Sequence, residues 1–374
     1  MKKLRIAVMV SGAYPAPPPQ HVIYAPIDVA VRISAGLSAR GHAVDFYGPI
    51  GTKVKGARVI SKNLLPLEGM RGEHKILKGD WVRTVERSKI FSLWDQYLIA
   101  HMYERAERGE HDLVHIHPVD SALAIARSHP RIPTIYTLHD PVFSWRAAVS
   151  QMLQSKNQLF VSISRAQKKA APRLNWLATV YNGIPVHDFP FSEKVGEYLV
   201  FVGRMHAKKG PAEAIEAAQK TGEKLILIGP HENDEYWKEK IKPHIGGNIQ
   251  YKGVVKPPEL YEYYARAKAL LFPVQWEEPF GLVMVEAMAC GTPVIAFRRG
   301  SVMEIIEDGK TGFIVRSIDE MAQSIKMIET ISRADCRRHV EKNFSVERMT
   351  DQYEAAFYKA LGLAKKSLHK TGSD

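Results

Sequence analysis

The sequence has few cysteines and no long apolar run, and both absences narrow what the protein can be. Two cysteines, Cys290 and Cys336, among 374 residues cannot form a disulfide framework or a cysteine zinc site. We therefore expect a protein of the reducing cytoplasm. No apolar segment approaches the roughly 20 residues that a membrane-spanning helix needs. A hydrophobic content of 45% and a charged content of 25% are typical of a folded globular protein.

Several motifs that bind cofactors are also missing. The turn after the first predicted strand lacks the G-x-G-x-x-G of dinucleotide-binding proteins, and no Walker sequence occurs. Histidine, cysteine and aspartate nowhere show a recognisable metal-ligand spacing, and there is no Asp-x-Asp pair. These absences disfavour a dehydrogenase, a nucleoside triphosphatase and a metal-dependent enzyme, so we expect neither a cofactor nor a metal.

The positive charge is concentrated in the first half of the chain. Residues 1–185 contain 25 Lys and Arg against 13 Asp and Glu, whereas residues 186–374 contain 27 of each. Such an excess is often plain surface decoration, but it also suits an anionic acceptor or a peripheral contact with a lipid surface. We expect no nucleic-acid partner, because the chemical motifs described below lie in the second half, whose net charge is zero.

Strand-like and helical patterns alternate along the whole chain. This alternation is typical of an α/β protein with parallel, doubly wound sheets. The pattern restarts after Asn182-Gly183-Ile184-Pro185, which predicts two Rossmann-like domains, 1–184 and 185–345. Strands are expected at 4–10, 43–47, 113–117, 134–138 and 159–163, and then at 198–202, 225–228, 269–274 and 294–297. A helix from residue 346 onward should follow, with disorder over 365–374.

The segment EEPFGLVMVEAMACGTPVIAF, residues 277–297, poses a physical problem. Glu286 is the one polar residue between Leu282 and Cys290, in a short helix that is apolar on all sides. A lone ionised carboxylate is costly there unless it is paired or hydrogen-bonded. The helix start after Pro279 also offers free backbone amides, which suit an anion. A nucleotide-sugar would supply hydroxyls and phosphates, while an internal ion pair of Glu286 remains the structural alternative.

Residues 200–210, VFVGRMHAKKG, add two cations at the end of a predicted strand. Gly203 permits a sharp turn, after which Arg204 and Lys209 could face the crevice where open α/β sheets bind ligands. Two cations suit a diphosphate. Taken alone, two such cations are more typical of a solvated surface.

The combination of Gly-Arg-x4-Lys-Gly with Glu-x7-Glu resembles the retaining nucleotide-sugar glycosyltransferases of family 4. The resemblance covers nearly the whole chain and implies the GT-B architecture, in which two Rossmann-like domains face a cleft. It also implies that the first domain binds the acceptor, the second binds the nucleotide-sugar, and the terminal helix 346–364 packs back on the first domain. No metal would be required.

The same resemblance implies a role for individual residues. Glu286 would hold the ribose hydroxyls, Glu278 would lie at the transferred sugar, and Arg204 and Lys209 would hold the diphosphate. Further donor contacts would come from Gly12, Gly229, Val254, Phe280, Gly281 and Leu282.

Two histidines end predicted strands, where chemistry usually occurs in such sheets. The resemblance places a donor-sugar contact at His117, whereas His115 is expected to be a core residue. For His139, contact with acceptor or sugar and a purely structural role both remain open. The aromatic stretch from Phe91 to Tyr103 should mainly pack in the core, with an acceptor groove or membrane contact as the alternative.

The sequence thus predicts a retaining glycosyltransferase that moves a hexose from a UDP- or GDP-linked donor to an acceptor hydroxyl. That acceptor could belong to a glycolipid, a polysaccharide precursor or a small metabolite. A sugar-nucleotide epimerase or phosphorylase on the same fold is the related alternative. A non-catalytic basic binding protein is the alternative of a different class.

Overall fold

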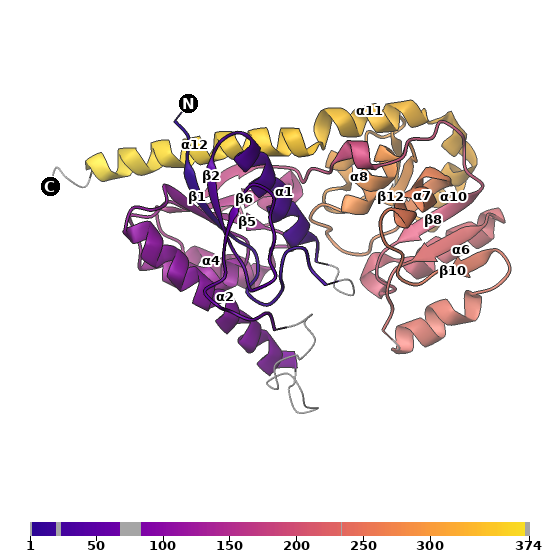
Figure 1. Ribbon diagram of the computed structural model, residues 1–374. Coiled ribbons are helices and arrows are strands. Elements are labelled where there is room, and N and C mark those ends of the chain that lie inside the picture. Colours follow the sequence, from indigo (N-terminus) through magenta and orange to yellow (C-terminus); the bar gives the residue numbers. More distant parts are fainter. Residues whose placement is uncertain (1, 20–23, 68–83, 233, 371–374) are drawn as a thin grey trace. The chain divides into compact units, whose positions relative to one another are not determined.

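The computed structural model describes residues 2–19, 24–67, 84–232 and 234–370 (Figure 1). Contacts between Cα atoms divide the chain into two compact units. Unit 1 comprises residues 1–163, 168–180 and 349–374, and unit 2 comprises residues 164–167 and 181–348. The last helix therefore belongs, from Met349 onward, to the unit formed by the start of the chain.

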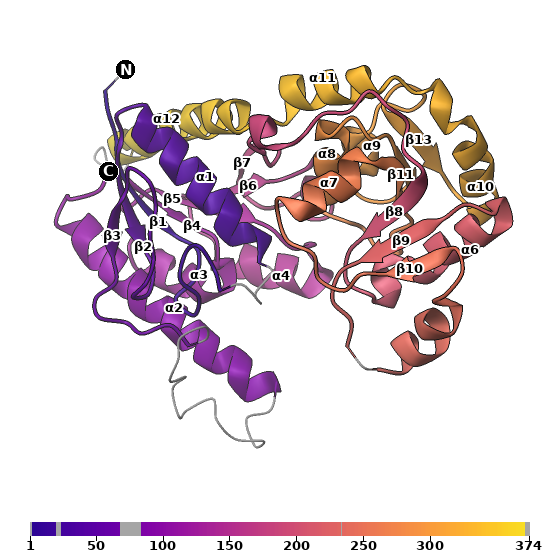
Figure 2. The ribbon, with the colours of Figure 1, turned by 45° about the vertical axis from the view of Figure 1, so that its right-hand side comes forward.

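Unit 1 contains a seven-stranded parallel sheet with the order β3-β2-β1-β4-β5-β6-β7 (Figure 2). The order runs outward in both directions from β1, as in a doubly wound sheet. Its strands are β1 (Arg5–Met9), β2 (Ala43–Tyr47), β3 (Arg58–Ile60), β4 (Leu113–Ile116), β5 (Thr134–Leu138), β6 (Gln158–Ser162) and β7 (Trp176–Thr179). Its helices are α1 (Ala25–Ala39), α2 (Thr84–Glu107), α3 (Val119–Arg127) and α4 (Ser144–Leu153), with α5 (Arg165–Lys169) and α12 (Val346–Lys370) passing between the units along the chain.

Two apolar clusters cover the two faces of this sheet. Alternate side chains of β1 enter different clusters, since Ile6 and Val8 pack with α1 and α12, whereas Ala7 and Met9 pack with α2, α3 and α4. Within α12, Tyr353 donates or accepts a hydrogen bond of 3.0 Å with Thr137 of β5. The sheet is thus buried on both faces, as parallel sheets generally are.

Unit 2 contains a six-stranded parallel sheet with the order β10-β9-β8-β11-β12-β13. Its strands are β8 (Tyr198–Val202), β9 (Leu225–Ile228), β10 (Ile249–Tyr251), β11 (Ala267–Phe272), β12 (Val294–Phe297) and β13 (Gly312–Val315). Its helices are α6 (Pro211–Thr221), α7 (Glu259–Ala265), α8 (Leu282–Ala289), α9 (Val302–Ile305), α10 (Ile318–Met327) and α11 (Arg333–Asn343). Two parallel Rossmann-like sheets confirm the predicted fold class.

The end of the chain differs from the prediction. Helix α12 continues through Lys370, so the expected disorder over 365–374 is wrong for most of that segment, and the final four residues lie outside the described part. Among the described residues, no helix combines the length and the apolar character that crossing a bilayer requires.

Candidate functional site

A lysine, a glutamate and a tryptophan form one contact network in unit 2. Lys209 Nζ lies 2.5 Å from Glu278 Oε2, and Trp276 Nε1–H donates to the same oxygen at 2.8 Å. The Lys209 ammonium also lies 4.9 Å from the centre of the Trp276 ring. The Glu278 side chain is only 9% exposed and that of Lys209 is 22% exposed. The sequence separates the two charges by 69 positions, and the fold joins them.

The backbone around this network is held at several points. Gly210 follows Lys209 with a φ of 78°, and a Cβ on it would lie 2.0 Å from the carbonyl oxygen of Pro273. After Glu278, Ser301 donates through its backbone N–H to the Glu278 carbonyl at 3.0 Å and through its hydroxyl to the Phe280 carbonyl at 2.8 Å. These contacts hold the loop that carries Glu278, and Lys209 and Trp276 hold its carboxylate.

Helix α8 begins directly after this loop. Gly281 precedes it with a φ of 81°, and no described side chain caps its N-terminus. The amides at Leu282 and beyond therefore give the start of α8 a partial positive charge. Phe280 is buried beneath this turn.

Glu286 lies one turn into α8 and is partly exposed, whereas residues 284, 285 and 287–290 are buried. The hydroxyl of Tyr264, from α7, donates to Glu286 Oε2 at 3.0 Å. Burial, and then the neighbouring Glu286 carboxylate, raise the pKa of Tyr264 well above its usual value, so the phenol stays protonated and keeps donating. A neutral phenol thus holds one carboxylate oxygen of Glu286.

Arg204 lines a second part of unit 2. Its exposed side chain borders a cavity of about 110 Å³ together with Met205, His206, Pro230, His231, Glu232 and Asp234. Gly229, just before Pro230, has a φ of 139°, and a Cβ on it would lie 2.0 Å from the Gly203 carbonyl oxygen. Val254 is 48% exposed, beyond the end of β10.

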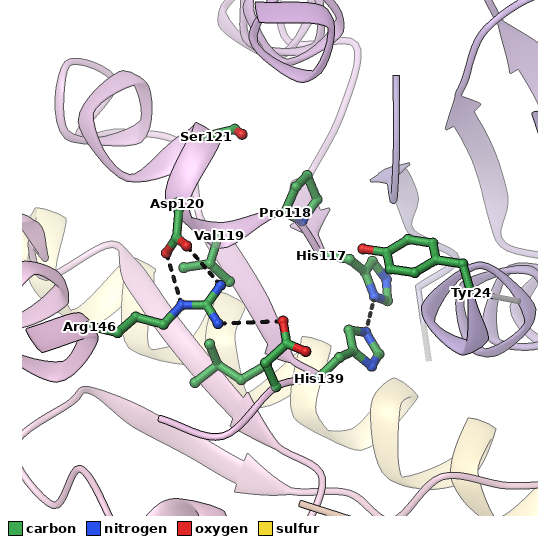
Figure 3. Close-up of a pocket in the computed structure, with 10 residues that line it drawn as sticks. Tyr24, His117, Pro118, Val119, Asp120, Ser121, His139 and Arg146 are labelled. Atoms are coloured by element: carbon green, nitrogen blue, oxygen red, sulfur yellow. Dashed lines mark hydrogen bonds and ion pairs between the residues drawn. The ribbon is translucent and has the colours of Figure 1, made fainter. Parts of the chain in front are cut away.

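Unit 1 has its own polar cavity of about 180 Å³, shown in Figure 3. It lies beyond the ends of β4 and β5, and its lining includes His117, His139, Tyr24, Ser121 and Arg146. The rings of His117 and His139 are stacked, with an interplanar angle of 13°, and His117 Nδ1 lies 2.6 Å from His139 Nε2.

Both histidines of this pair are neutral. Burial lowers the pKa of His139 to about 3, with a smaller effect from Arg146, and lowers the pKa of His117 well below its usual value. Because two neutral rings share one proton across their hydrogen bond, their outer nitrogens are complementary. If His117 donates through Nδ1, its Nε2 is an acceptor, and if it accepts, its Nε2 is a donor. That Nε2 is buried without a hydrogen-bond partner among the described residues.

Among the described residues that line the cavity, Arg146 supplies the one guanidinium, and it is already paired. Arg146 contacts Asp120 at 2.9 Å and Asp140 at 3.5 Å (Figure 3 shows the pairing with Asp120). With one cation, two carboxylates and two neutral imidazoles, the cavity has no excess positive charge. It is rich in groups that exchange hydrogen bonds with hydroxyls.

Gly12 lies at the end of β1, where its N–H donates to Asp95 Oδ1 of α2 at 2.7 Å. A Cβ on Gly12 would lie 2.5 Å from the Trp94 carbonyl oxygen, so the fold needs glycine there for packing as well. The other oxygen of Asp95 accepts from Ser121, a residue of the His117 cavity, at 3.4 Å. The surrounding protein desolvates Asp95 and raises its pKa to about 7, although the bonds from Gly12 and Ser121 lower it.

The structure therefore groups the sequence-predicted residues into separate sets. Lys209 joins Glu278 and His117 joins His139, whereas Arg204 and Glu286 have surroundings of their own. Sequence reasoning missed Trp276, Tyr264, Asp95 and Arg146. Trp276 stands two positions before Glu278 and could have been considered, but Tyr264 and Asp95 carry no local signal.

Two family descriptions match consecutive parts of the chain. "Glycosyltransferase Family 4" matches residues 17–188, and "Glycosyl transferases group 1" matches residues 187–344. Together they span residues 17–344, which include most of both units. The chain belongs to the family 4 type of glycosyltransferases, which confirms the resemblance seen in the sequence.

Individual relatives are distant. Spore coat protein SA of Bacillus subtilis is 28% identical over 43% of this chain, and the match spans about half of that relative, 48%. N-acetyl-alpha-D-glucosaminyl L-malate synthase of Bacillus anthracis is 25% identical over 74% of this chain and 83% of its own. D-inositol 3-phosphate glycosyltransferase of Geodermatophilus obscurus is 25% identical over 87% of this chain and 83% of its own.

Solved structures share the fold at low identity. Sucrose-phosphate synthase from Thermosynechococcus elongatus superposes with a TM-score of 0.74 at 19% identity, covering 96% of this chain and 100% of that one. Anabaena Alr3699/HepE, solved in complex with UDP and glucose, gives 0.70 at 18% identity, with 95% and 99% covered. These similarities define the GT-B fold for this chain.

Proposed function

We propose that this protein is a retaining glycosyltransferase that moves a hexose from a UDP- or GDP-linked donor to an acceptor hydroxyl, without a required metal. The observation that carries the proposal is the Lys209–Glu278 pair beside the uncapped start of α8. A cation, a fixed carboxylate and a helix N-terminus within one loop system suit a ligand with both phosphates and hydroxyls. Anabaena Alr3699/HepE, which has this fold, was solved with UDP-glucose.

For donor binding, Glu286 would accept hydrogen bonds from the two ribose hydroxyls. Tyr264 already holds Glu286 Oε2, which orients the carboxylate. Lys209 and Arg204 would bind the diphosphate, and the amides of Gly281 and Leu282 would add to its charge neutralisation. Gly229 and Val254 remain candidates for the base pocket, and Gly12 for close approach to the diphosphate.

For transfer, the bond between the anomeric carbon and the donor phosphate oxygen breaks while the acceptor oxygen attacks from the same face. The leaving phosphate takes the acceptor proton, so atoms and charge balance without a protein nucleophile. Lys209 and Arg204 stabilise the negative charge that develops on the diphosphate, and the fixed Glu278 carboxylate stabilises the positive charge at the anomeric carbon. Two permanent cations would take the part that a metal has in other transferases.

For the acceptor, the His117 cavity of unit 1 favours a hydroxyl-rich molecule. Its guanidinium is neutralised by two carboxylates, so it offers little attraction to a polyanion. The unpartnered Nε2 of His117 can either donate to or accept from a hydroxyl, whether of the acceptor or, as the resemblance implies, of the transferred donor sugar. We therefore favour a neutral sugar or polyol group over the anionic acceptor that the net charge first suggested.

A thermal-shift screen of UDP-, GDP- and ADP-sugars against their free nucleotides tests donor binding. We expect one nucleotide series to raise the melting temperature in the wild type, and a smaller rise in Glu286→Gln. Equal shifts for all bases and for both proteins would refute the donor site. Once a donor is found, NMR of the product shows whether the anomeric configuration is retained, and turnover with a chelator shows whether a metal is needed.

A further inference from the structure

Helix α4 carries several of its apolar side chains on the outside. Trp145, Val149 and Met152 are 61%, 41% and 69% exposed, and Ala148 between them is exposed too. These positions follow the i, i+3, i+4, i+7 spacing of a single helix face. The buried residues of the same helix are Ala147 and Ser150. A surface helix normally shows the reverse arrangement, so this apolar α4 face lacks a partner within the described part of the chain.

The surroundings of α4 are positively charged. Residues 141–187 contain six Lys and Arg and no Asp or Glu. At the C-terminal end of α4, Arg127 donates to the Leu153 and Gln154 carbonyls at 3.4 and 3.2 Å, and Gln154 donates to the Arg173 carbonyl at 3.1 Å. Arg127, Arg173 and Lys156 are all exposed. The two carboxylates near the start of the helix both face Arg146.

We propose that the apolar α4 face docks the protein on the surface of an anionic lipid bilayer. A helix of 10 residues is too short to span a membrane, but it can lie in the plane of the interface with one face among the acyl chains. Tryptophan prefers that depth, and the cations at the end of α4 would face lipid phosphates. Charge complementarity thus selects a lipid surface over an apolar protein partner.

The same helix also reaches the cavity of unit 1. Arg146 follows Trp145 directly and lines the His117 cavity, while Trp145 points to solvent. Docking through α4 would hold that cavity at the level of the lipid head groups. A sugar acceptor carried by a lipid anchor would reach it there, and this last step rests on the proposed transferase function.

Flotation with lipid vesicles tests the docking without any donor or acceptor. Wild-type protein should float with vesicles of phosphatidylcholine and phosphatidylglycerol, and far less with phosphatidylcholine alone. The variant Trp145→Gln/Val149→Gln/Met152→Gln should partition about a thousandfold more weakly, since each of the three buried apolar side chains contributes about tenfold. Lys156→Gln and Arg173→Gln should each weaken it about fivefold. All these side chains are exposed, so the thermal unfolding of the variants should match the wild type.

A matched control replaces two apolar residues of unit 2, Val195→Gln/Met327→Gln, which are 48% and 52% exposed, and should float like the wild type. Brominated lipids should quench the fluorescence of Trp145 in the wild type. This quenching should disappear in Trp145→Phe, although that variant still binds the vesicles. Equal flotation of the wild type and the triple variant would overturn the proposal. The proposal would also be overturned if the wild type were a dimer and the triple variant a monomer, because a second copy would then cover the apolar α4 face. Neither result would contradict the proposed donor site, which the thermal-shift screen tests separately.

Discussion

Replacing Glu278 with glutamine should change donor binding and turnover in opposite directions. Lys209 Nζ is held by Glu278 Oε2 at 2.5 Å. A nucleoside diphosphate must compete with that carboxylate for the lysine and must also tolerate the negative charge of Glu278. Glu278→Gln removes both costs, while the group that stabilises the positive sugar is lost. We therefore expect tighter binding of the free diphosphate and slower transfer.

The size of each effect follows from the exposure of the pair. Breaking a fully buried ion pair costs about 3–5 kcal/mol, and an exposed pair contributes about 1 kcal/mol or less. The side chains of Lys209 and Glu278 are 22% and 9% exposed, and glutamine can still accept from Trp276. We expect Glu278→Gln to lower the free energy of unfolding by about 1–2 kcal/mol, between these limits. A bound diphosphate should restore most of this lost stability in Glu278→Gln, so its Kd should be about tenfold tighter than in the wild type.

Calorimetric titration with UDP and GDP measures Kd, and melting with and without nucleotide measures the recovered stability. Glu277→Gln is the matched control, because this neighbouring acid accepts from the Gly300 N–H at 2.7 Å and does not contact Lys209 in the part of the chain described. It should leave Kd unchanged. Turnover of Glu278→Gln at saturating donor should fall by about 10²-fold or more.

Two results would refute this reasoning. If Glu278→Gln bound nucleotide no better than the wild type, Lys209 would not be the cation that the diphosphate takes over. If turnover stayed near normal while binding tightened, Glu278 would not lie at the transferred sugar. Weaker binding with lower stability would indicate that Glu278 only shapes the loop.

Four further predictions can be checked separately. Arg204→Ala, assayed at saturating donor, should cut turnover by about 10²-fold, and a near-normal rate would exclude Arg204 from leaving-group stabilisation. Tyr264→Phe should weaken nucleotide binding by about tenfold in calorimetry, because Glu286 loses a charge-assisted hydrogen bond. His139 has a folded pKa of about 3 against 6.5 ordinarily, so it contributes stability above pH 6.5 that is lost as the pH falls; His139→Gln should flatten that part of a pH series of urea unfolding. The pH dependence from Asp95 has the opposite sign, because its pKa rises from 3.8 to about 7 and its contribution to stability is lost as the pH rises across this range. Asp95→Asn should remove that loss in the same series of urea unfolding.

The strands predicted from the sequence and those missed fall in different places in the sheets. All nine predicted strands occur, with shifts of at most two residues at either end. The four missed strands, β3, β7, β10 and β13, are the outermost strands of the two sheets. Interior strands of a parallel sheet are buried on both faces and read as apolar runs, whereas an edge strand such as Arg58–Ile60 is short and half-exposed. Its sequence therefore carries too little pattern to be detected.

The site was predictable as far as local patterns extend. Glycine turns, strand ends and the spacing of Glu278 and Glu286 indicate where ligand chemistry belongs, because each is a feature of one short segment. The partners of those residues come from distant segments. Tyr264 meets Glu286 across 22 positions, and Asp95 meets Gly12 across 83, so only the folded chain could reveal them.

Glu286 shows how the two kinds of information combine. The sequence indicates that a carboxylate in an apolar helix needs a partner, and the structure supplies a buried phenol that donates to one of its oxygens. A hydrogen-bond donor that stays neutral orients the carboxylate without cancelling its charge. Glu286 is also partly exposed although the residues that follow it in α8 are buried. A partly exposed carboxylate that a phenol orients suits two neighbouring ribose hydroxyls, and on this ground we propose a donor site in unit 2.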